Sequence, residues 1–198
     1  MSLEGKKLSF GYRRKGRVLE EIDLAVEPGE RVGLAGPSGR GKTTLCKLLA
    51  GYEKPDGGAV LLDGRPLDTY RGLCPVQMIW QHPETAVDPL LKLRDSVSEA
   101  GPVAEELLEA LHIQPGWLER YPTELSGGEL QRFCIARALA PGVKYLLCDE
   151  ITAMLDPITQ AQIWKLILAE AERRNLGLLI VSHDSALLER LCTRIQSL

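Results

Sequence analysis

A glycine-rich segment in the first quarter of the chain ends in a lysine and two threonines. The segment consists of Gly36, Pro37, Ser38, Gly39, Arg40, Gly41, Lys42, Thr43 and Thr44. Its first eight residues fit the pattern Gly-x-x-x-x-Gly-Lys-Ser/Thr. Glycines let the backbone curl so that successive N–H groups point at phosphate oxygens, and a following helix adds its positive dipole end. Although a plain glycine-rich turn is the alternative, the pattern predicts a nucleoside triphosphate site. Lys42 would reach the β- and γ-phosphates, and the Thr43 hydroxyl would ligate Mg²⁺.

Two adjacent acids, Asp149 and Glu150, follow an apolar run over 145–148 that is typical of a buried strand. Ligands of open α/β sheets bind at the carboxyl ends of the strands, so we expect Asp149 to hold the Mg²⁺. Consecutive strand residues face opposite ways, which leaves Glu150 to orient and deprotonate an attacking water. Many ordinary strands also end in acids, and the phosphate loop upstream is what favours the catalytic interpretation.

Three further side chains lie at the ends of predicted strands. Gln81 follows the apolar run Val76–Trp80, His183 follows Leu178–Val181 after one serine, and Tyr12 ends an N-terminal strand. Taken singly, each has an ordinary structural explanation as a polar strand end, a capping or surface histidine, or an edge-strand aromatic. Their interpretation therefore depends on the other motifs of the chain.

Strands that alternate with helices are expected to position these residues. Strands are predicted over 7–12, 18–26, 31–35, 59–62, 76–80, 145–148 and 178–181, the first two forming a hairpin around the turn 13–16. Helices are predicted over 44–50, 127–139 and 184–192. The alternation predicts an α/β fold, in one domain over 1–198, with a mainly parallel sheet and a helical lobe over about 83–140.

Two more helices are predicted from apolar residues at helical spacing. Pro102 fits a helix N-terminus, and its helix would carry on one face Val103, Leu107, Leu108 and Leu111. Asp156 is expected to cap a long helix with Pro157 in its first position. The predicted apolar stripe of this long helix is Ile158, Ala161, Trp164, Leu168 and Ala171.

The composition is that of a globular domain with 44% hydrophobic and 26% charged residues. The net charge of −3, from 24 Lys and Arg against 27 Asp and Glu, leaves no overall basic character for nucleic acid. No apolar run approaches the roughly 18–20 residues that cross a bilayer, and the first residues lack the apolar stretch of a secretory signal. The five cysteines are scattered, so we expect buried thiols in a reducing compartment and neither disulfides nor zinc.

A further motif lies between the phosphate loop and the paired acids. It consists of Leu125, Ser126, Gly127, Gly128 and Glu129. Ser126 is expected to open a helix whose first glycines leave bare backbone N–H groups for a second phosphate contact. In this order the three motifs resemble the nucleotide-binding domain of an ABC transporter. The resemblance implies a P-loop NTPase core with an N-terminal antiparallel β-subdomain and a short helical lobe.

The resemblance also implies roles for the remaining candidates. Tyr12 would stack on adenine, Gln81 would sense Mg²⁺ and the γ-phosphate, His183 would contact the γ-phosphate, and Glu150 would be the catalytic base. The metal set would be Thr43, Gln81 and Asp149. Five further residues would act in trans, on ATP held by a partner subunit: Ser126, Gly127, Gly128, Glu129 and Asp156.

The segments Val76–Gln81 and Tyr121–Leu125 are similar to those of the peptide and nickel importer branch of this family. This implies an ATPase subunit, peripheral at the cytoplasmic face of the cell membrane, that uses ATP and Mg²⁺. It would power the import of nickel, a metal chelate or short peptides. Expected partners are a second ATPase subunit (identical or different), transmembrane permease subunits and, indirectly, a solute-binding protein, with no nucleic acid.

Some features depart from the family pattern. Ile151-Thr152 replaces the usual Pro-Thr after the paired acids, and the lobe between Gln81 and Ser126 is short. Only fifteen residues follow His183, which leaves open whether the domain is minimal or truncated. Two other functions therefore stay open: a soluble ABC-type ATPase of DNA repair or translation, and a nucleotide-binding regulatory module that hydrolyses little.

Overall fold

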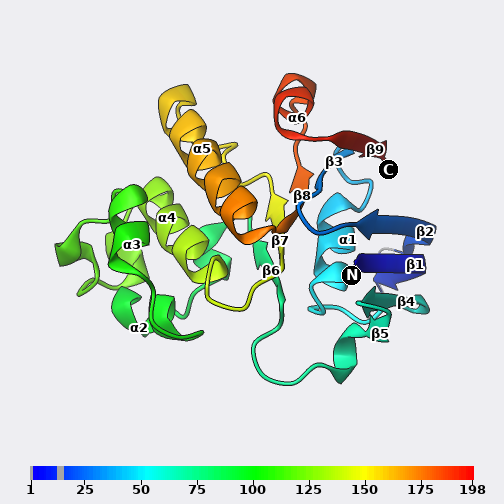
Figure 1. Cartoon of the computed structure of the whole chain (residues 1–198), viewed down its shortest axis with the longest axis horizontal. Coiled ribbons are helices and arrows are strands. Elements are labelled where there is room, and N and C mark those ends of the chain that lie inside the picture. Colours follow the sequence, from blue (N-terminus) through cyan, green and yellow to red (C-terminus); the bar gives the residue numbers. More distant parts are fainter. Residues whose placement is uncertain (1, 13–15) are drawn as a thin grey trace.

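The computed structural model describes residues 2–12 and 16–198 and contains two sheets, with helix α1 (Lys42–Leu49) between them (Figure 1). The antiparallel sheet has the order β2 (Gly16–Val26), β1 (Leu3–Tyr12), β4 (Gly57–Leu62) and β5 (Arg65–Pro66). The parallel sheet has the order β6 (Val76–Ile79), β7 (Tyr145–Asp149), β8 (Gly177–Val181), β3 (Arg31–Ala35) and β9 (Arg194–Ser197). The predicted fold class is confirmed.

The parallel sheet is buried on both faces, which explains why its central strands are continuously apolar. On β7, Tyr145 and Leu147 pack into the core that α1 shares with the antiparallel sheet. The alternate residues Leu146 and Cys148 pack into a second core. Because side chains alternate along a strand, one short apolar segment closes both cores and fixes the direction in which its carboxyl end points.

The part of the chain that the structure describes contains five more α-helices. The helical lobe contains α2 (Leu93–Ser98), α3 (Glu105–Ala110) and α4 (Gly127–Ala138) and lies on the side of the molecule away from the antiparallel sheet (Figure 1). The second core is covered by α5 (Pro157–Arg174) and α6 (Ser185–Leu191). Short 3₁₀ turns span Leu67–Thr69, Pro83–Thr85, Pro115–Trp117 and Pro122–Glu124. No helix in the described ranges is long and apolar enough to cross a membrane.

The prediction that a helix begins at Pro102 is wrong. Helix α3 begins at Glu105, and the preceding Gly101 has a φ of 119°. Its first turn carries Glu105 and Glu106, whose charges complement the positive end of the helix dipole. Val103 packs against the second core from the loop before the helix, and Leu111 lies just beyond its last residue.

The predicted apolar stripe of α5 is only partly correct. Trp164 and Ala171 are buried, but Ile158 is 73% exposed and Ala161 is also exposed. Ile163 and Ile167 are buried in their place, and Leu168 is half-buried. Both series recur at helical spacing, so periodicity alone cannot decide which of them meets the sheet.

Most predicted elements are confirmed to within a few residues, but the hairpin turn cannot be assessed because Arg13, Arg14 and Lys15 lie outside the described residues. Three elements were not predicted: α2, β5 and β9. They are short, and β9 is a mostly exposed edge strand whose sequence, Arg-Ile-Gln-Ser, lacks an apolar pattern.

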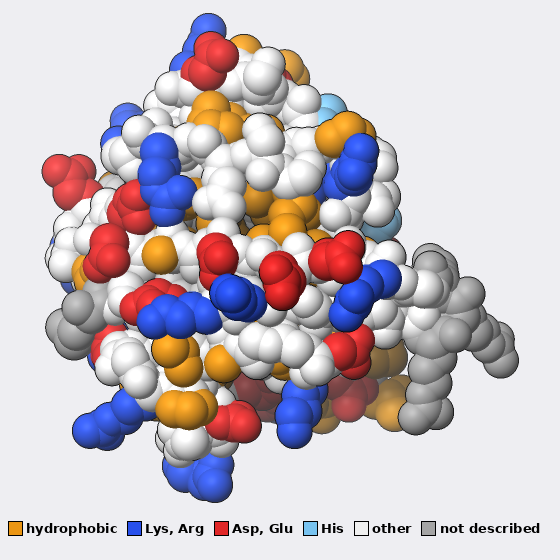
Figure 2. Space-filling view, turned by 90° about the vertical axis from the view of Figure 1, so that its right-hand side faces the viewer, with side chains coloured by type: hydrophobic (Ala, Val, Ile, Leu, Met, Phe, Trp, Pro, Cys, Tyr) orange, Lys and Arg blue, Asp and Glu red, His pale blue; other side chains and the backbone are white. Residues whose placement is uncertain are grey.

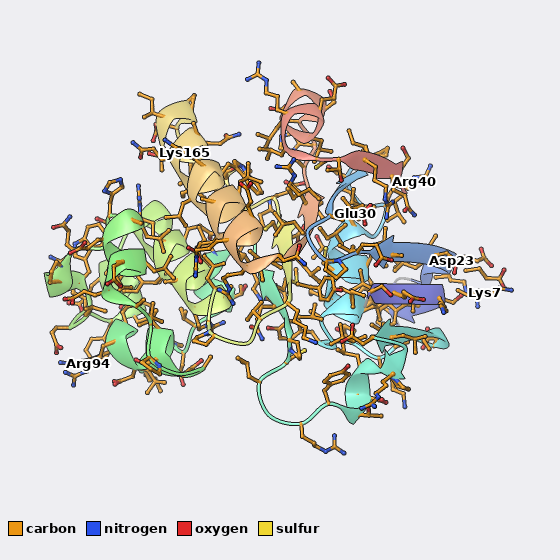
Figure 3. All side chains as sticks on the ribbon, viewed as in Figure 1. Lys7, Asp23, Glu30, Arg40, Arg94 and Lys165 are labelled. Carbon is orange, nitrogen blue, oxygen red and sulfur yellow. The ribbon has the colours of Figure 1, made fainter. Side chains whose placement is uncertain are left out.

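Charged side chains of both signs are interspersed over the face that carries the antiparallel sheet (Figure 2). Ion pairs in this part of the molecule include Lys6 with Glu4 and Arg194 with Glu30, each at 2.7 Å. Lys7, on the inner strand β1, lies at the far right of the view in Figure 3, and its backbone N–H donates to Oδ1 of Asp23 at 2.8 Å. None of these contacts involves a predicted site residue.

Candidate functional site

The phosphate loop joins β3 to α1 and curls around the side chain of its own lysine. Nζ of Lys42 donates to the carbonyl oxygens of Gly36 at 2.6 Å and Pro37 at 3.0 Å. Gly41 caps α1 with a φ of 93°, and a Cβ placed there would lie 2.8 Å from Cδ2 of Leu19. Glycine is therefore required at this position both by the left-handed backbone and by the close approach of β2.

A cavity of about 350 Å³ opens over this loop. Its walls come from β1, β2, the loop, the end of β6 and the end of β7, and are formed by Tyr12, Val18, Ser38, Gly39, Gly41, Lys42, Thr43, Thr44, Gln81 and Glu150. The sequence analysis missed Val18, whose only signal is its place on the strand predicted to pair with that of Tyr12. Gly36, Pro37 and Arg40 belong to the loop but do not line this cavity. The Arg40 side chain is exposed at the outside of the molecule, opposite Arg94 of the helical lobe (Figure 3).

Asp149 lies behind the phosphate loop at the end of β7 and is only 2% exposed. Burial raises the pKa of this carboxyl, while a hydrogen bond with the Thr43 side chain acts in the opposite direction. A carboxylate and a hydroxyl beside a phosphate loop are hard oxygen donors of the kind that Mg²⁺ prefers. The residues present therefore fit a magnesium ion.

Glu150 stands where two neighbouring strand ends meet. Its Oε2 accepts a hydrogen bond from Nε2 of Gln81 at 3.3 Å and lies 3.4 Å from Nδ1 of His183. The expectation that strand alternation separates Asp149 from Glu150 needs correction, because β7 ends at Asp149. Glu150 instead has a left-handed backbone, with a φ of 50°, and its N–H donates to the carbonyl of Val181 at 3.1 Å. The structure thus brings together three residues that the sequence places far apart.

Ser126 caps α4, as the sequence predicted, in a reciprocal arrangement with Glu129. The Ser126 side chain accepts from the Glu129 N–H at 3.4 Å, while Oε2 of Glu129 accepts from the Ser126 N–H at 2.8 Å and from its hydroxyl at 2.7 Å. These hydrogen bonds lower the pKa of Glu129. A Cβ on Gly127 would meet open space, so the start of α4 presents bare backbone.

Gly127 and Gly128 line a cavity of about 480 Å³ that also reaches Gln81 and Glu150. Four of the five residues predicted to act in trans, all but Gly127, line a different cavity of about 350 Å³. It is lined by His112, Trp117, Ser126, Gly128, Glu129, Arg132, Met154, Leu155, Asp156 and Thr159. Asp156 Oδ1 accepts from the backbone N–H groups of Ile158 and Thr159, both at 3.0 Å, so its predicted cap is confirmed. The cavity lined by Ser126 and the cavity over the phosphate loop share no lining residue. Within one chain, the Ser126 motif therefore does not line the cavity over the phosphate loop. The sequence analysis missed Trp117, whose neighbourhood carries no motif, and Arg132, which follows the Ser126 motif on α4.

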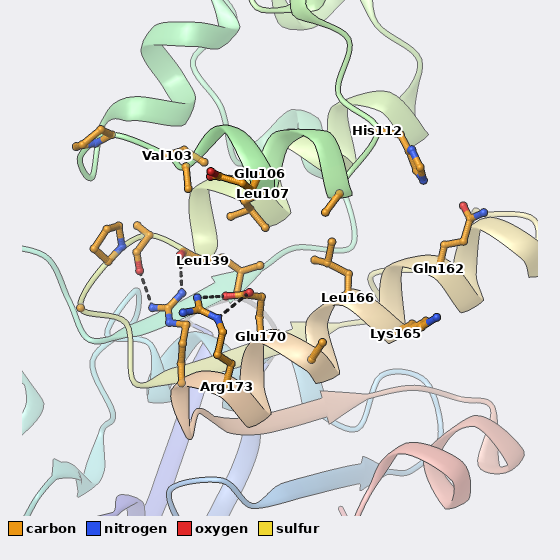
Figure 4. A pocket seen from close by; sticks show the side chains of 18 residues that line it. Val103, Glu106, Leu107, His112, Leu139, Gln162, Lys165, Leu166, Glu170 and Arg173 are labelled. Carbon is orange, nitrogen blue, oxygen red and sulfur yellow. Dashed lines mark hydrogen bonds and ion pairs between the residues drawn. The ribbon is translucent and has the colours of Figure 1, made fainter.

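A groove of about 900 Å³ lies between α3 and α5 and is lined by none of the predicted site residues (Figure 4). At one end of it Arg174 closes α4, donating to the carbonyl oxygens of Leu139 at 2.7 Å and Ala140 at 2.8 Å. Burial lowers the pKa of this guanidinium. Beside it, Arg173 pairs with Glu170 at 2.7 Å. The Arg174 contacts tie the end of α4 to the end of α5, whereas the Arg173 pair lies within α5.

Comparison with known proteins identifies the family. The sequence profile of the ABC transporter family matches residues 19–153. The chain is 38% identical over 198 residues to the nickel import ATP-binding protein NikE of Rhodospirillum rubrum, covering 90% of this chain and 71% of that protein. It is 34% identical over 206 residues to the nickel import system ATP-binding protein NikE of Staphylococcus aureus, covering 98% and 84%. The fold is similar to that of a bacterial ABC transporter cassette solved as a dimer, with a TM-score of 0.85 and 25% identity over 99% of this chain and 94% of that one. The chain therefore belongs to the ABC transporter family, as one of its ATP-hydrolysing cassettes.

Proposed function

We propose that this chain hydrolyses ATP in the cavity over the phosphate loop, with Glu150 as the base that activates water. The observation that carries this proposal is the convergence of Gln81 and His183 on one carboxylate oxygen of Glu150, at the rim of the cavity that contains Lys42. A general base must be held within hydrogen-bond reach of the water that it deprotonates. Two neighbouring side chains limit the directions in which this carboxylate can point.

The phosphate-binding groups act through charge and position. Lys42 is engaged by the carbonyls of Gly36 and Pro37, and it exchanges these for phosphate oxygens when ATP enters. Thr43 and Asp149, with Gln81 at the edge, would hold Mg²⁺, which when bound neutralises developing charge on the phosphates. Tyr12 lines the same cavity and offers an aromatic face to the adenine.

The complete site requires a second subunit. In one chain the cavity that contains Lys42 is lined by none of Ser126, Gly127, Gly128, Glu129 and Asp156. We infer that they face the ATP of a second cassette, identical or related. The dimeric arrangement of the similar solved cassette supports this inference.

The cargo is inferred from the relatives. The two NikE proteins are named for nickel import, and each is matched over more than two thirds of its length. We propose that this cassette powers a nickel importer, in which it lies at the cytoplasmic face of the membrane against permease subunits fed by a solute-binding protein. Nickel uptake by cells that lack the ATPase subunits and receive this chain with its neighbouring permease genes tests the cargo. Uptake of short peptides but not nickel would reassign it.

Phosphate release from ATP by the purified chain, alone and with its permease, tests the catalytic proposal. The Glu150→Gln variant is expected to bind ATP and to lose turnover by at least ~100-fold, because glutamine cannot accept the proton from water. The Glu189→Gln variant, a substitution of the same kind on the exposed face of α6, is the matched control and keeps full activity. Unchanged phosphate release by Glu150→Gln would remove Glu150 from the role of base.

A further inference from the structure

A buried hydrogen bond ties the turn after Glu150 to helix α5. Nε1 of Trp164 donates to Oγ1 of Thr152 at 3.1 Å, and each residue is only 4% exposed. Trp164 is in the second turn of α5, whereas Thr152 is two positions beyond Glu150. Loss of either partner would leave a buried polar group without this hydrogen bond, which makes the contact costly to break.

The turn that carries Thr152 begins at a strained residue. Glu150 has a φ of 50°, a left-handed conformation that is strained for a non-glycine residue and persists only where the surroundings enforce it. The Ala153 N–H donates to the Glu150 carbonyl and the Leu155 N–H donates to the Thr152 carbonyl, both at 3.1 Å. Thr152 is therefore the residue of this turn whose side chain anchors it to a long helix.

One side of Glu150 faces an open pocket of about 120 Å³, whose lining also includes Thr152, Trp164 and His183. Because neighbouring atoms do not surround the turn on this side, packing alone does not hold it in one position. A directional hydrogen bond across the wall of this pocket supplies the missing restraint.

We propose that Thr152 and Trp164 are positioning residues for Glu150: their hydrogen bond holds the strained turn so that the Glu150 carboxylate meets Gln81 and His183. This inference rests on the proposed role of Glu150 as the base. Neither residue lines the nucleotide cavity, so we expect their substitution to lower the rate of the chemical step and to leave the affinity for ATP unchanged. A misplacement of about 1 Å at a catalytic group can cost as much as ~100-fold in rate.

Steady-state kinetics of three variants test the proposal. Thr152→Val removes the hydroxyl at nearly constant volume and is expected to lower kcat about tenfold, with KM for ATP unchanged within about twofold. Thr152→Ser keeps a hydroxyl and is expected to restore most of the activity. Ser96→Ala, which removes a buried hydroxyl of α2 that has no hydrogen-bond partner among the described residues, is the matched control and keeps the parent kcat.

Two further measurements separate positioning from general stability. In the Glu150→Gln background, Thr152→Val is expected to cause no further loss of the residual turnover, because it acts through Glu150. Without nucleotide, Thr152→Val and Trp164→Phe are both expected to speed amide hydrogen exchange over residues 150–155, where the Ala153 N–H reports the turn.

The inference is overturned if Thr152→Val keeps the parent kcat, if it lowers the residual turnover of Glu150→Gln equally, or if exchange over 150–155 is unchanged. If Glu150→Gln is inactive while Thr152→Val is fully active, the proposed function stands and this inference alone fails. If Glu150→Gln turns over ATP like the parent, the proposed function fails first, whatever Thr152→Val does.

Discussion

Gln81 and Glu150 are 69 positions apart in the chain, yet Nε2 of Gln81 donates to Oε2 of Glu150 at 3.3 Å. The contact is possible because β6 and β7 are parallel neighbours, with Ile79 opposite Cys148, so that the residues just beyond both strands meet at one edge of the sheet. The two hydrophobic cores fix the order of the strands. This order brings Gln81, which follows β6, next to the proposed base Glu150, which follows β7.

Replacement of Gln81 by alanine is expected to lower kcat by about 10- to 100-fold while ATP still binds, because the Glu150 carboxylate loses a hydrogen bond that orients it. Phosphate release and nucleotide titration measure the two effects. Gln77→Ala is the matched control: this glutamine lies on β6, the strand that precedes Gln81, but its side chain donates to the Cys74 carbonyl, and its loss should leave kcat unchanged. Equal activities of the two variants would contradict the assigned contact.

Replacement of Lys42 by alanine is expected to weaken ATP binding by at least ~100-fold, since a cationic hydrogen-bond donor to the phosphates is lost. Arg40, in the same loop, is exposed and does not line the cavity, so Arg40→Ala should change the Kd by less than about threefold at physiological salt. Titration with a fluorescent ATP analogue checks both variants. Similar losses from both would indicate that the loop attracts ATP by general charge and not through the Lys42 side chain.

Removal of the Asp149 charge is expected to stabilise the nucleotide-free protein. Burial raises the pKa of Asp149, so the folded state binds its proton more tightly than the unfolded state does. The contribution of the Asp149 carboxyl to the free energy of unfolding therefore falls as pH rises from the ordinary aspartate pKa through the raised value. The advantage of Asp149→Asn over the parent in unfolding free energy should grow across that window and then level off. Urea unfolding at several pH values measures it, and a constant difference would contradict the cause given for the shift.

The Arg174→Ala variant is expected to lose about 1–3 kcal/mol of unfolding free energy, because buried carbonyl groups at the end of α4 lose their donor. Arg173→Ala is the matched control, since that side chain is exposed and pairs with Glu170 on the same helix. Its unfolding midpoint should be nearly that of the parent. Urea unfolding distinguishes the two, and equal stabilities would show that Arg174 does not hold α4 in place.

The sequence predicted the strands and helix caps whose burial or hydrogen bonding leaves a pattern in neighbouring residues. Strands buried on both faces, such as β7 and β8, appear as unbroken apolar runs, and Ser126 and Asp156 cap their helices as their positions suggest. The predicted fold class and family are confirmed by the structure and by the relatives. The roles of the individual site residues stay predictions, although the structure places Tyr12, Lys42, Gln81 and Glu150 around one cavity.

The remainder depends on tertiary contacts that no local pattern records. The face of α5 that packs on the sheet is set by Ile163 and Ile167, and only the position of the helix distinguishes them from the equally periodic Ile158. The left-handed backbone of Glu150 and the hydrogen bond from Trp164 to Thr152, twelve positions apart in the chain, occur where a turn packs against α5. A sequence read one segment at a time does not reveal them.

The most direct test of the account is the structure of the Glu150→Gln variant grown with ATP and magnesium. We expect the triphosphate to lie in the loop around Lys42, with adenine against Tyr12 and with Ser126 of a second subunit closing on the γ-phosphate. A structure in which that cavity is empty while ATP occupies another part of the chain would contradict the central claim.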